Sequence, residues 1–265
     1  MADATGFHLK GSAPERYEHY VAPLMAPFVT ALVDAADLFP GATVLDLACG
    51  TGFAARAAAA QAGPTGRVAG TDVDEAMLKV AVALHPRLYP DIEFTAAPAD
   101  DLPYADETFD AVLCQQGTQF FPDLDAALRE AARVTRPGGR FTATVWTDLD
   151  ASPYFAAQHR AIERYGGPEP AAAFKRAFDT ADRLTTALAR AGFHGPTGRE
   201  LTVPITLPPL EDYVPGHLSA TCWGRTLTET AGEEALVRAA DALRAALPGD
   251  TSTFPFTATL VTALR

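Results

Sequence analysis

The stretch from Val44 to Gly52, with the sequence VLDLACGTG, constrains the fold more than any other part of the chain. Its first residues predict a short buried strand, which runs directly into a glycine-containing turn. The alanine-rich segment Phe53–Ala62 follows without a helix breaker and predicts a helix. A strand, a tight turn and a helix N-terminus together expose backbone N–H groups that can hold a polar ligand.

Three residues of this stretch suggest what kind of ligand it holds. Gly50 and Gly52 allow the backbone to approach a ligand because no Cβ stands in the way. Asp46 places a carboxylate near the end of an apolar strand, where it is costly without a partner. A cationic amino group on the ligand would be a suitable partner. The alternative is a surface carboxylate at a frayed strand end.

Strands and helices alternate after an N-terminal helical segment, Ala13–Phe39, in which prolines predict a break or a kink. This alternation predicts an α/β fold with a doubly wound parallel sheet and helices on both faces. The predicted strands are Thr43–Leu47, Arg67–Thr71, Asp91–Thr95, Asp110–Cys114 and Gly139–Thr147. The predicted helices are Phe53–Ala62, Glu75–Leu84 and Asp123–Arg136.

The pattern changes after Thr147. Two segments predict helical insertions, Asp148–Phe178 and Leu210–Leu247, and between and after them lie a helix at Thr180–Ala191 and strands near Thr197–Leu207 and Phe256–Leu264. We therefore predict three parts. They are an N-terminal helical lid (1–40), a ligand-binding core (41–147), and the remainder of the core with two helical substrate-cap insertions (148–265).

Composition excludes several classes of function. A net charge of −12 disfavours nucleic acid as a partner, since phosphate binding normally requires a basic surface. No apolar run reaches the length of a membrane span. Three widely spaced cysteines predict buried thiols in a reducing compartment, and no His/Cys/Asp spacing suggests a metal site. We expect a cytoplasmic protein.

Four sequence blocks follow one another in the order found in a known family: Val44–Gly52, Gly70–Leu78, Leu102–Asp110 and Leu128–Arg140. In this order they resemble the class I S-adenosylmethionine-dependent methyltransferases, in particular the ubiquinone/menaquinone-type branch and its small-molecule relatives. The resemblance implies a Rossmann-like sheet of seven strands with the last one antiparallel. It also implies S-adenosyl-L-methionine as the cofactor.

The resemblance assigns cofactor contacts to the first two blocks. Asp46, Gly50, Thr51 and Gly52 would hold the amino acid part of the cofactor. Asp72, at the end of the second predicted strand, would accept hydrogen bonds from the ribose hydroxyls. Its alternative role is to cap the following helix, a task that suits Asp74. Val73 would lie against the adenine face.

A third contact departs from the family pattern. Where the family has an acid or amide four residues before the Leu-Pro pair, this chain has Pro98. Ala99 could offer its backbone N–H to the adenine ring instead, and Asp100 could replace the missing side chain. Gln115 matches a family cofactor-contact position after the fourth strand, and Tyr20 is a candidate lid contact.

The acceptor is expected where the fourth strand ends and in the insertions. Gln116, Thr118 and Gln119 could orient it, and Phe120 and Trp223 could form walls. The alternative is a capped loop that binds no acceptor and whose aromatic side chains belong to the hydrophobic core. Methyl transfer needs alignment, desolvation and, for a hydroxyl or ammonium acceptor, removal of a proton. Candidate bases are His217 and His159, which lie in the insertions, and His19.

We therefore expect methyl transfer to a small organic acceptor that is apolar or aromatic. O-methylation is favoured over N- or C-methylation. A homodimer is possible. A reaction such as cyclisation, with S-adenosylmethionine only bound, would use the same motifs. A nicotinamide-dependent oxidoreductase is another alternative, because Gly50, Gly52 and Ala55 fit the dinucleotide fingerprint and Asp72 follows about 20 residues on. A non-catalytic ligand sensor is a third.

Overall fold

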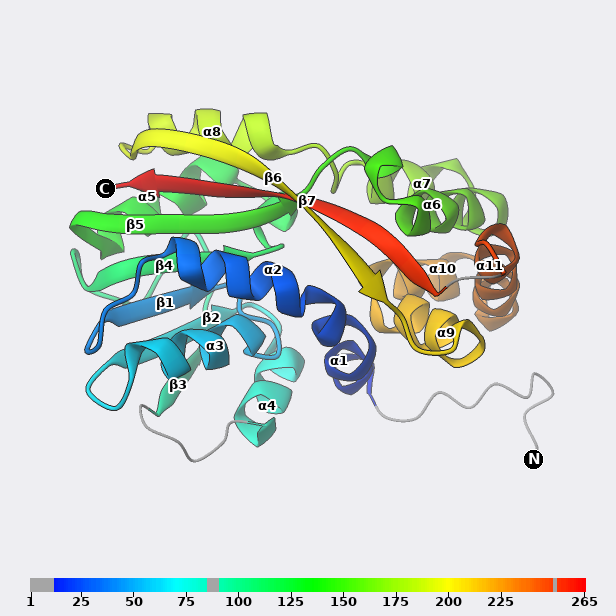
Figure 1. Ribbon diagram of the computed structural model, residues 1–265, viewed down its shortest axis with the longest axis horizontal. Coiled ribbons are helices and arrows are strands. Elements are labelled where there is room, and N and C mark those ends of the chain that lie inside the picture. The colour runs from blue at the N-terminus through cyan, green and yellow to red at the C-terminus, as the bar shows by residue number, and fades with distance from the viewer. Residues whose placement is uncertain (1–11, 85–90, 250–251) are drawn as a thin grey trace. The chain divides into compact units, whose positions relative to one another are not determined.

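The computed structural model describes residues 12–84, 91–249 and 252–265. Within them, seven strands form one sheet in the order β3-β2-β1-β4-β5-β7-β6 (Figure 1). The strands are β1 Thr43–Leu47, β2 Arg67–Asp72, β3 Ile92–Ala96, β4 Phe109–Gln115, β5 Thr135–Trp146, β6 His194–Thr206 and β7 Thr253–Leu264. Strands β1 to β5 pair in parallel, and β7 runs antiparallel to β5. The predicted α/β class and the antiparallel last strand are confirmed.

The helices fall where the sequence pattern places them, with a few shifts at their ends. They are α1 Ala13–Arg16, η1 Tyr17–Val21, α2 Ala22–Ala35, α3 Phe53–Ala62, α4 Glu75–Leu84, η2 Thr118–Phe120, α5 Leu124–Val134, η3 Leu149–Ala151, α6 Pro153–Gly166, α7 Pro168–Lys175, α8 Ala181–Arg190, α9 Leu210–Ala220, α10 Cys222–Ala231 and α11 Glu233–Ala246. The bounds of α3 and α4 match the prediction. Both predicted insertions are helical.

The junction between α5 and β5 differs from the prediction. The helix ends at Val134, and the strand begins at Thr135 instead of Gly139. The Thr135 hydroxyl donates a hydrogen bond of 2.6 Å to the Ala131 carbonyl, which closes the last turn, while the Thr135 backbone is already extended. The register of β5 against β4 then shifts between Phe109 and Ala111, so the Pro-Gly-Gly sequence is absorbed within the strand.

The N-terminal helical segment also differs. It ends at Ala35, not Phe39, and Pro27 lies inside α2 without dividing it. The irregularity comes earlier, in η1, a π-helical turn in which the Ala22 N–H bonds to the Tyr17 carbonyl. A proline removes one backbone bond but does not by itself end a helix whose apolar face is buried, as Phe28 and Leu32 are here.

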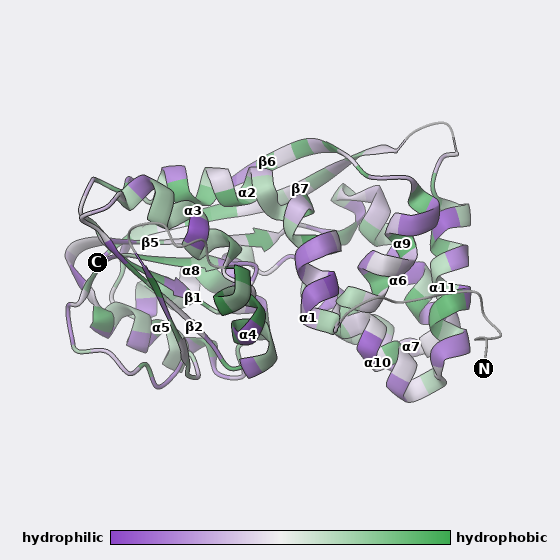
Figure 2. Cartoon of the chain, turned by 90° about the horizontal axis from the view of Figure 1, so that it is seen from below, coloured by the Kyte–Doolittle hydropathy of each residue, from purple (hydrophilic) through white to green (hydrophobic). Residues whose placement is uncertain are grey.

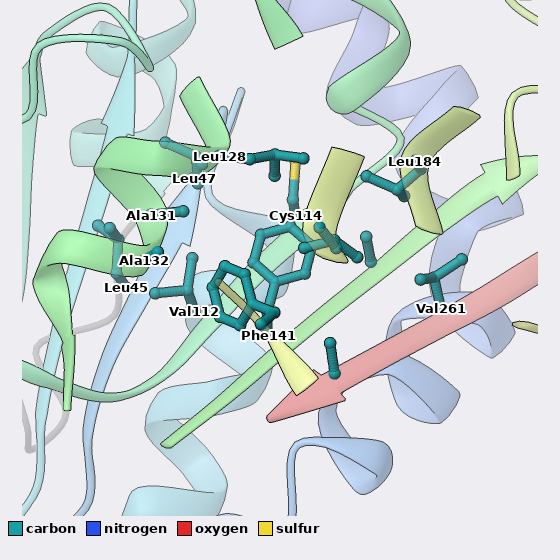
Figure 3. Close-up of a cluster of buried hydrophobic side chains, with 14 of the residues drawn as sticks. Leu45, Leu47, Val112, Cys114, Leu128, Ala131, Ala132, Phe141, Leu184 and Val261 are labelled. Carbon is teal, nitrogen blue, oxygen red and sulfur yellow. The ribbon is translucent and has the colours of Figure 1, made fainter. Parts of the chain in front are cut away.

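Helices cover both faces of the parallel strands. On one face Leu45 and Leu47 of β1 pack with Leu128 of α5, Phe141 of β5 and Leu184 of α8 (Figure 3). The opposite face carries the alternate residues of the same strands. There the Asp46 carboxylate reaches α3, and the Trp146 ring of β5 packs against Phe28 of α2 at 5.3 Å between centroids. The buried strands are thus sealed on both sides, as a parallel sheet requires.

The chain divides into two compact units. Unit 1 comprises residues up to 25, 148–178 and 202–257, and unit 2 comprises 26–147, 179–201 and 258–265. Unit 1 is a helical assembly in which α6 packs on α7 and α11. Its helix α11 alternates hydrophilic and hydrophobic residues along its length (Figure 2). The predicted division at 40 and 147 stays a prediction, and residues 1–11 of the predicted lid lie outside the described part of the chain.

Candidate functional site

Polar residues gather at the carboxyl edge of the sheet in unit 2. Strands β1, β2 and β4 run in parallel, so the turns that follow Leu47, Asp72 and Gln115 open at the same edge. In open α/β sheets this edge, near the change in strand order, is where ligands bind. The sheet order places β1 centrally, between β2 and β4, so its turn is the middle one of the three.

The turn after β1 depends on left-handed backbone. Ala48, Gly50 and Gly52 have φ values of 57°, 55° and 78°. A Cβ on Gly52 would lie 2.7 Å from the Phe94 ring, so this glycine is required for packing. A Cβ on Gly50 would meet no protein atom within 4 Å. Gly50 therefore faces space beside the turn, where a ligand can approach the backbone. Thr51, between them, is buried.

Asp46 lies one residue before the end of β1 and is 1% exposed, so the alternative of a surface carboxylate at a frayed end is wrong. Its Oδ2 accepts a hydrogen bond of 2.8 Å from the Ala55 N–H in the first turn of α3. Its Oδ1 is buried without a partner. Desolvation by burial raises the pKa of this carboxyl to about 7, and the nearby Asp72 charge adds to the rise.

Asp72 ends β2 and joins two turns. Its Oδ2 accepts from the Gly50 N–H at 2.8 Å, and its Oδ1 accepts from the Asp74 N–H at 2.9 Å. Burial raises the pKa of the Asp72 carboxyl, against these two hydrogen bonds, which lower it. The start of α4 is capped by Asp74, whose Oδ1 accepts from the Ala76 N–H at 2.9 Å. Asp72 therefore organises the glycine turn and does not cap α4.

The predicted adenine contacts lie around this pair. Val73 follows Asp72 and is 71% exposed. Ala99 is half-buried and packs against the core of unit 2, while Asp100 is exposed. An exposed apolar residue beside a carboxylate suits a nucleoside, whose flat base would lie against the apolar side chain while the carboxylate holds its polar groups. Contact of Val73, Ala99 and Asp100 with adenine remains a prediction.

Three glutamines lie at the end of β4: Gln115 is its last residue, and Gln116 and Gln119 follow it. The Gln119 Nε2 donates to the Gln116 Oε1 at 3.0 Å, which leaves the Gln116 Nε2 and the Gln119 Oε1 buried without partners. The Gln115 Nε2 is also buried and unpaired. Gln116 has a left-handed φ of 52°. Thr118 is buried; of the two aromatics in the alternative of a core-packed cap, Phe121 packs against the core of unit 2, whereas Phe120 is 51% exposed and does not fit it.

The unit 2 edge fits a ligand that is cationic at one end and hydroxylated at the other. The unpaired Asp46 oxygen calls for a donor, and a positive charge would also relieve the cost of its burial. The space beside Gly50 admits such a ligand along the turn. Asp72 is half-buried and presents a carboxylate that hydroxyl groups could share. The chemistry of these residues therefore suits a sulfonium nucleoside with an amino acid tail.

The remaining predicted residues lie in unit 1. Tyr20 and His19 are neighbours on η1, with ring centroids 4.5 Å apart; His19 is exposed and Tyr20 is half-buried. His159 of α6 and Trp223 of α10 both pack on Phe174 of α7, at 6.1 and 5.3 Å between ring centroids. The Phe174–Trp223 contact is therefore one of those that join the two predicted insertions.

His217 differs from the other histidines in its burial. It is 2% exposed, and its Nδ1 lies 3.2 Å from the Tyr154 hydroxyl. Desolvation lowers the pKa of His217 to about 4, so the ring is neutral at physiological pH. If Nδ1 donates to the Tyr154 hydroxyl, Nε2 is the nitrogen that can accept a proton; if Nδ1 accepts from that hydroxyl, Nε2 already carries the ring proton. The structure does not select among the three predicted bases.

Several notable groups were not predicted as site residues. Gln158 is buried on α6 with both amide atoms unpaired, and Tyr213 has a buried hydroxyl without a partner. A signal was present in the sequence for Gln158: it lies four residues after Tyr154, on the same helix face as that buried ring. The left-handed Ala48 gave no such signal, because alanine rarely adopts that conformation.

Two negative findings concern the described residues only. No group of three or more His, Cys, Asp or Glu side chains among them is arranged to hold a metal ion. None of their helices is both long enough and apolar enough to cross a membrane.

Comparison with a family model adds direct evidence on the core. The model of a methyltransferase domain matches residues 45–143. This span runs from β1 into β5 and contains the three turns of the unit 2 edge. It excludes the helices of unit 1 that lie after β5.

Curated relatives match the same part of the chain. The ubiquinone/menaquinone biosynthesis C-methyltransferase UbiE of Hahella chejuensis is 42% identical over 110 residues, which cover 41% of this chain and 44% of the relative. The chain spans less than half the length of the curated relatives it matches. The likeness therefore concerns the core and not the whole proteins.

Solved structures match nearly the whole chain at low identity. The YcgJ protein of Bacillus subtilis has a TM-score of 0.61 at 18% identity and covers 91% of this chain and 98% of its own. The [4+2]-cyclase SpnF has a TM-score of 0.56 at 20% identity and covers 98% of this chain and 84% of its own. These likenesses show the fold alone.

Proposed function

Residues 45–143 belong to the class I S-adenosylmethionine-dependent methyltransferase family, whose cofactor is S-adenosyl-L-methionine, and from this premise we propose that the chain transfers a methyl group to a small organic acceptor. The observation that carries the proposal is the pair of carboxylates at the unit 2 edge. Asp46 has a buried unpaired oxygen, and Asp72 is bonded to the Gly50 N–H that lies beside open space.

The residues of this edge would hold the cofactor at two points. Asp46 would face the amino acid end together with the backbone of Gly50 to Gly52, and Asp72 would receive the ribose hydroxyls. Val73 would cover one face of the adenine, and Ala99, Asp100 and Gln115 complete the predicted set. When bound, the cofactor supplies a methyl group activated by the neighbouring sulfonium charge.

The protein's own task is then alignment and exclusion of water. The Gln116–Gln119 pair supports a role in orienting the acceptor. Because one hydrogen bond joins the two carboxamides, either amide orientation leaves one N–H donor and one carbonyl acceptor unpaired. A neutral acceptor could bond to both. Thr118, Phe120 and Trp223 remain predicted acceptor contacts.

Proton removal, where the acceptor requires it, would fall to one of three histidines. His217 is neutral and paired with Tyr154, while His159 and His19 are more exposed. A carbon or hydroxyl acceptor that ionises easily needs no base of its own. The relatives' names specify C-methyltransferases, so carbon and oxygen acceptors are both retained in the proposal. A cytoplasmic location stays part of it, supported by the three cysteines without disulfides among the described residues; Cys49 and Cys114 are buried as predicted, whereas Cys222 is exposed.

Titration calorimetry with S-adenosylmethionine, its demethylated product and nicotinamide dinucleotides tests the cofactor. We expect micromolar binding of the first two. Binding of a dinucleotide alone would overturn the proposal. Release of demethylated cofactor with a panel of quinols and phenols then tests methyl transfer. An acceptor that is converted while the cofactor is not consumed would instead indicate a reaction such as cyclisation.

A further inference from the structure

The interior of unit 1 contains an aromatic cluster with polar tips. Tyr154 of α6 lies against Tyr213 and His217 of α9, at 6.2 and 5.3 Å between ring centroids. The Tyr213 and His217 rings stack at 5.3 Å with 25° between their planes. Tyr154 is fully buried, and its hydroxyl is paired with His217 as described above.

Three polar atoms of this region have no partner. They are both amide atoms of Gln158 and the hydroxyl of Tyr213. Gln158 is 1% exposed and Tyr213 is 3% exposed. A buried polar atom without a hydrogen bond lowers the stability of the fold, so leucine at 158 and phenylalanine at 213 would make unit 1 more stable. Groups that lower stability in this way are typical of binding sites.

The chemistry of the cluster restricts the ligand. Burial keeps His217 uncharged at neutral pH, the other two rings are phenols, and Gln158, one helical turn after Tyr154 on α6, adds a carboxamide, so none of these groups carries a full charge. The cluster would therefore reject a carboxylate or an ammonium group. Gln158 offers one donor and one acceptor whichever way its amide is turned, and Tyr213 can donate or accept. These partners suit a hydroxyl or carbonyl group.

Helix α9 has the features of an element that can move. Pro215 and Gly216 lie inside it, between Tyr213 and His217. Pro215 leaves the carbonyl four residues earlier without its helical partner, and Gly216 is less constrained than other residues. The Tyr20 ring packs directly against Gly216, so a Cβ at this position would overlap the ring. Pro215 and Gly216 thus weaken the helical hydrogen bonding of the segment that carries Tyr213, and it is held mainly by the packing of its buried side chains.

We propose that α6 and α9 form a binding site for a neutral ring compound with a hydroxyl or carbonyl group, and that Gln158 and Tyr213 are its hydrogen-bonding partners. The three unpaired atoms are sealed from solvent in the structure, so the ligand enters as α9 moves away from α6.

The stability of two variants tests the site without any ligand. We expect Gln158→Leu and Tyr213→Phe each to raise the thermal unfolding midpoint, by roughly 2–6 °C for one relieved polar group. Gln61→Leu is the matched control, because Gln61 is exposed on α3 and should leave the midpoint unchanged. A lower midpoint for Gln158→Leu would mean that the amide is satisfied in solution, and would overturn the proposal.

Binding of three matched probes tests the ligand class. We expect 2-naphthol to bind more tightly than naphthalene and 2-naphthoate, and each variant to weaken 2-naphthol about fivefold or more. No binding of 2-naphthol, equal binding of naphthalene, or 2-naphthol binding that both variants retain would overturn the site. Calorimetry with S-adenosylmethionine on the same proteins separates the two proposals: affinity for the cofactor should not change in either variant, and its absence in the wild type would contradict only the proposed function.

Discussion

The carboxyl edge of unit 2 and the interior of unit 1 both bury an ionisable side chain, with opposite results. In unit 2 the pKa of Asp46 rises to about 7, and in unit 1 the pKa of His217 falls to about 4. Desolvation is the first cause in both cases, and in both it favours the neutral form. The two regions therefore place opposite pH dependences on the stability of one chain.

The two regions also differ in where their partners come from. Asp46 and Asp72 bond to backbone N–H groups of Ala55 and Gly50, which the strand and turn sequence brings to them. His217 bonds to Tyr154, which is 63 residues away along the chain. A site made of short-range contacts can be predicted from a motif, whereas a site made by helix packing depends on tertiary structure.

The largest effect should come from Asp46→Asn. Because the folded pKa lies above the ordinary value of 3.8, the folded protein binds the extra proton between about pH 4 and 7, and wild-type stability falls as pH rises through that range. The asparagine variant lacks this loss. Relative to wild type, its free energy of unfolding should rise by up to about 4 kcal/mol between pH 4 and 8. Urea unfolding without cofactor measures this difference. A difference that does not change with pH would contradict the burial of an unpaired carboxyl.

His217→Asn should show the opposite dependence and a slightly smaller one. The folded pKa lies below the ordinary value of 6.5, so the unfolded chain binds more protons between about pH 4 and 6.5, and wild-type stability rises with pH in that range. Asparagine keeps a polar group near Tyr154 but does not titrate. The variant should therefore lack this rise in the free energy of unfolding, which should reach about 3 kcal/mol in the wild type. Urea unfolding over the same pH series measures it. A variant that keeps the wild-type pH slope would show that His217 is solvated.

These contrasts explain how much the sequence could predict. The strand before the glycine turn, the helix after it and the positions of Asp46 and Asp72 depend on neighbouring residues, and their predictions are confirmed as to place. The pairing of Tyr154 with His217 could not be predicted, because two helices far apart in sequence create it. The first residues of β5, before Gly139, were not predicted as strand. The pairing of Thr135 with Phe109 overrides the turn preference of the Pro-Gly-Gly sequence.

Asp72→Ala should weaken S-adenosylmethionine binding by roughly one to two orders of magnitude, because the substitution removes a carboxylate and frees the turn that it holds through the Gly50 N–H. Calorimetry gives the dissociation constants. Asp74→Ala is the control, since Asp74 caps α4 through the Ala76 N–H and should alter stability more than affinity. Equal losses in both variants would mean that Asp72 acts only through local folding.

Gly117→Ala tests how tightly the turns after β1 and β4 are locked together. A Cβ at Gly117 would lie 2.8 Å from both the Ala48 Cβ and the Cys114 Sγ, so a turn must shift, at a cost of roughly 1–2 kcal/mol in urea unfolding. Ala48→Gly removes one of the two contacts and the cost of a left-handed alanine. If the contact with Ala48 is the main obstacle, the double variant should recover most of the loss. Strictly additive effects would place the obstacle at Cys114, on the β4 side, and the turn after β1 would then be set by its own glycines and by Asp72.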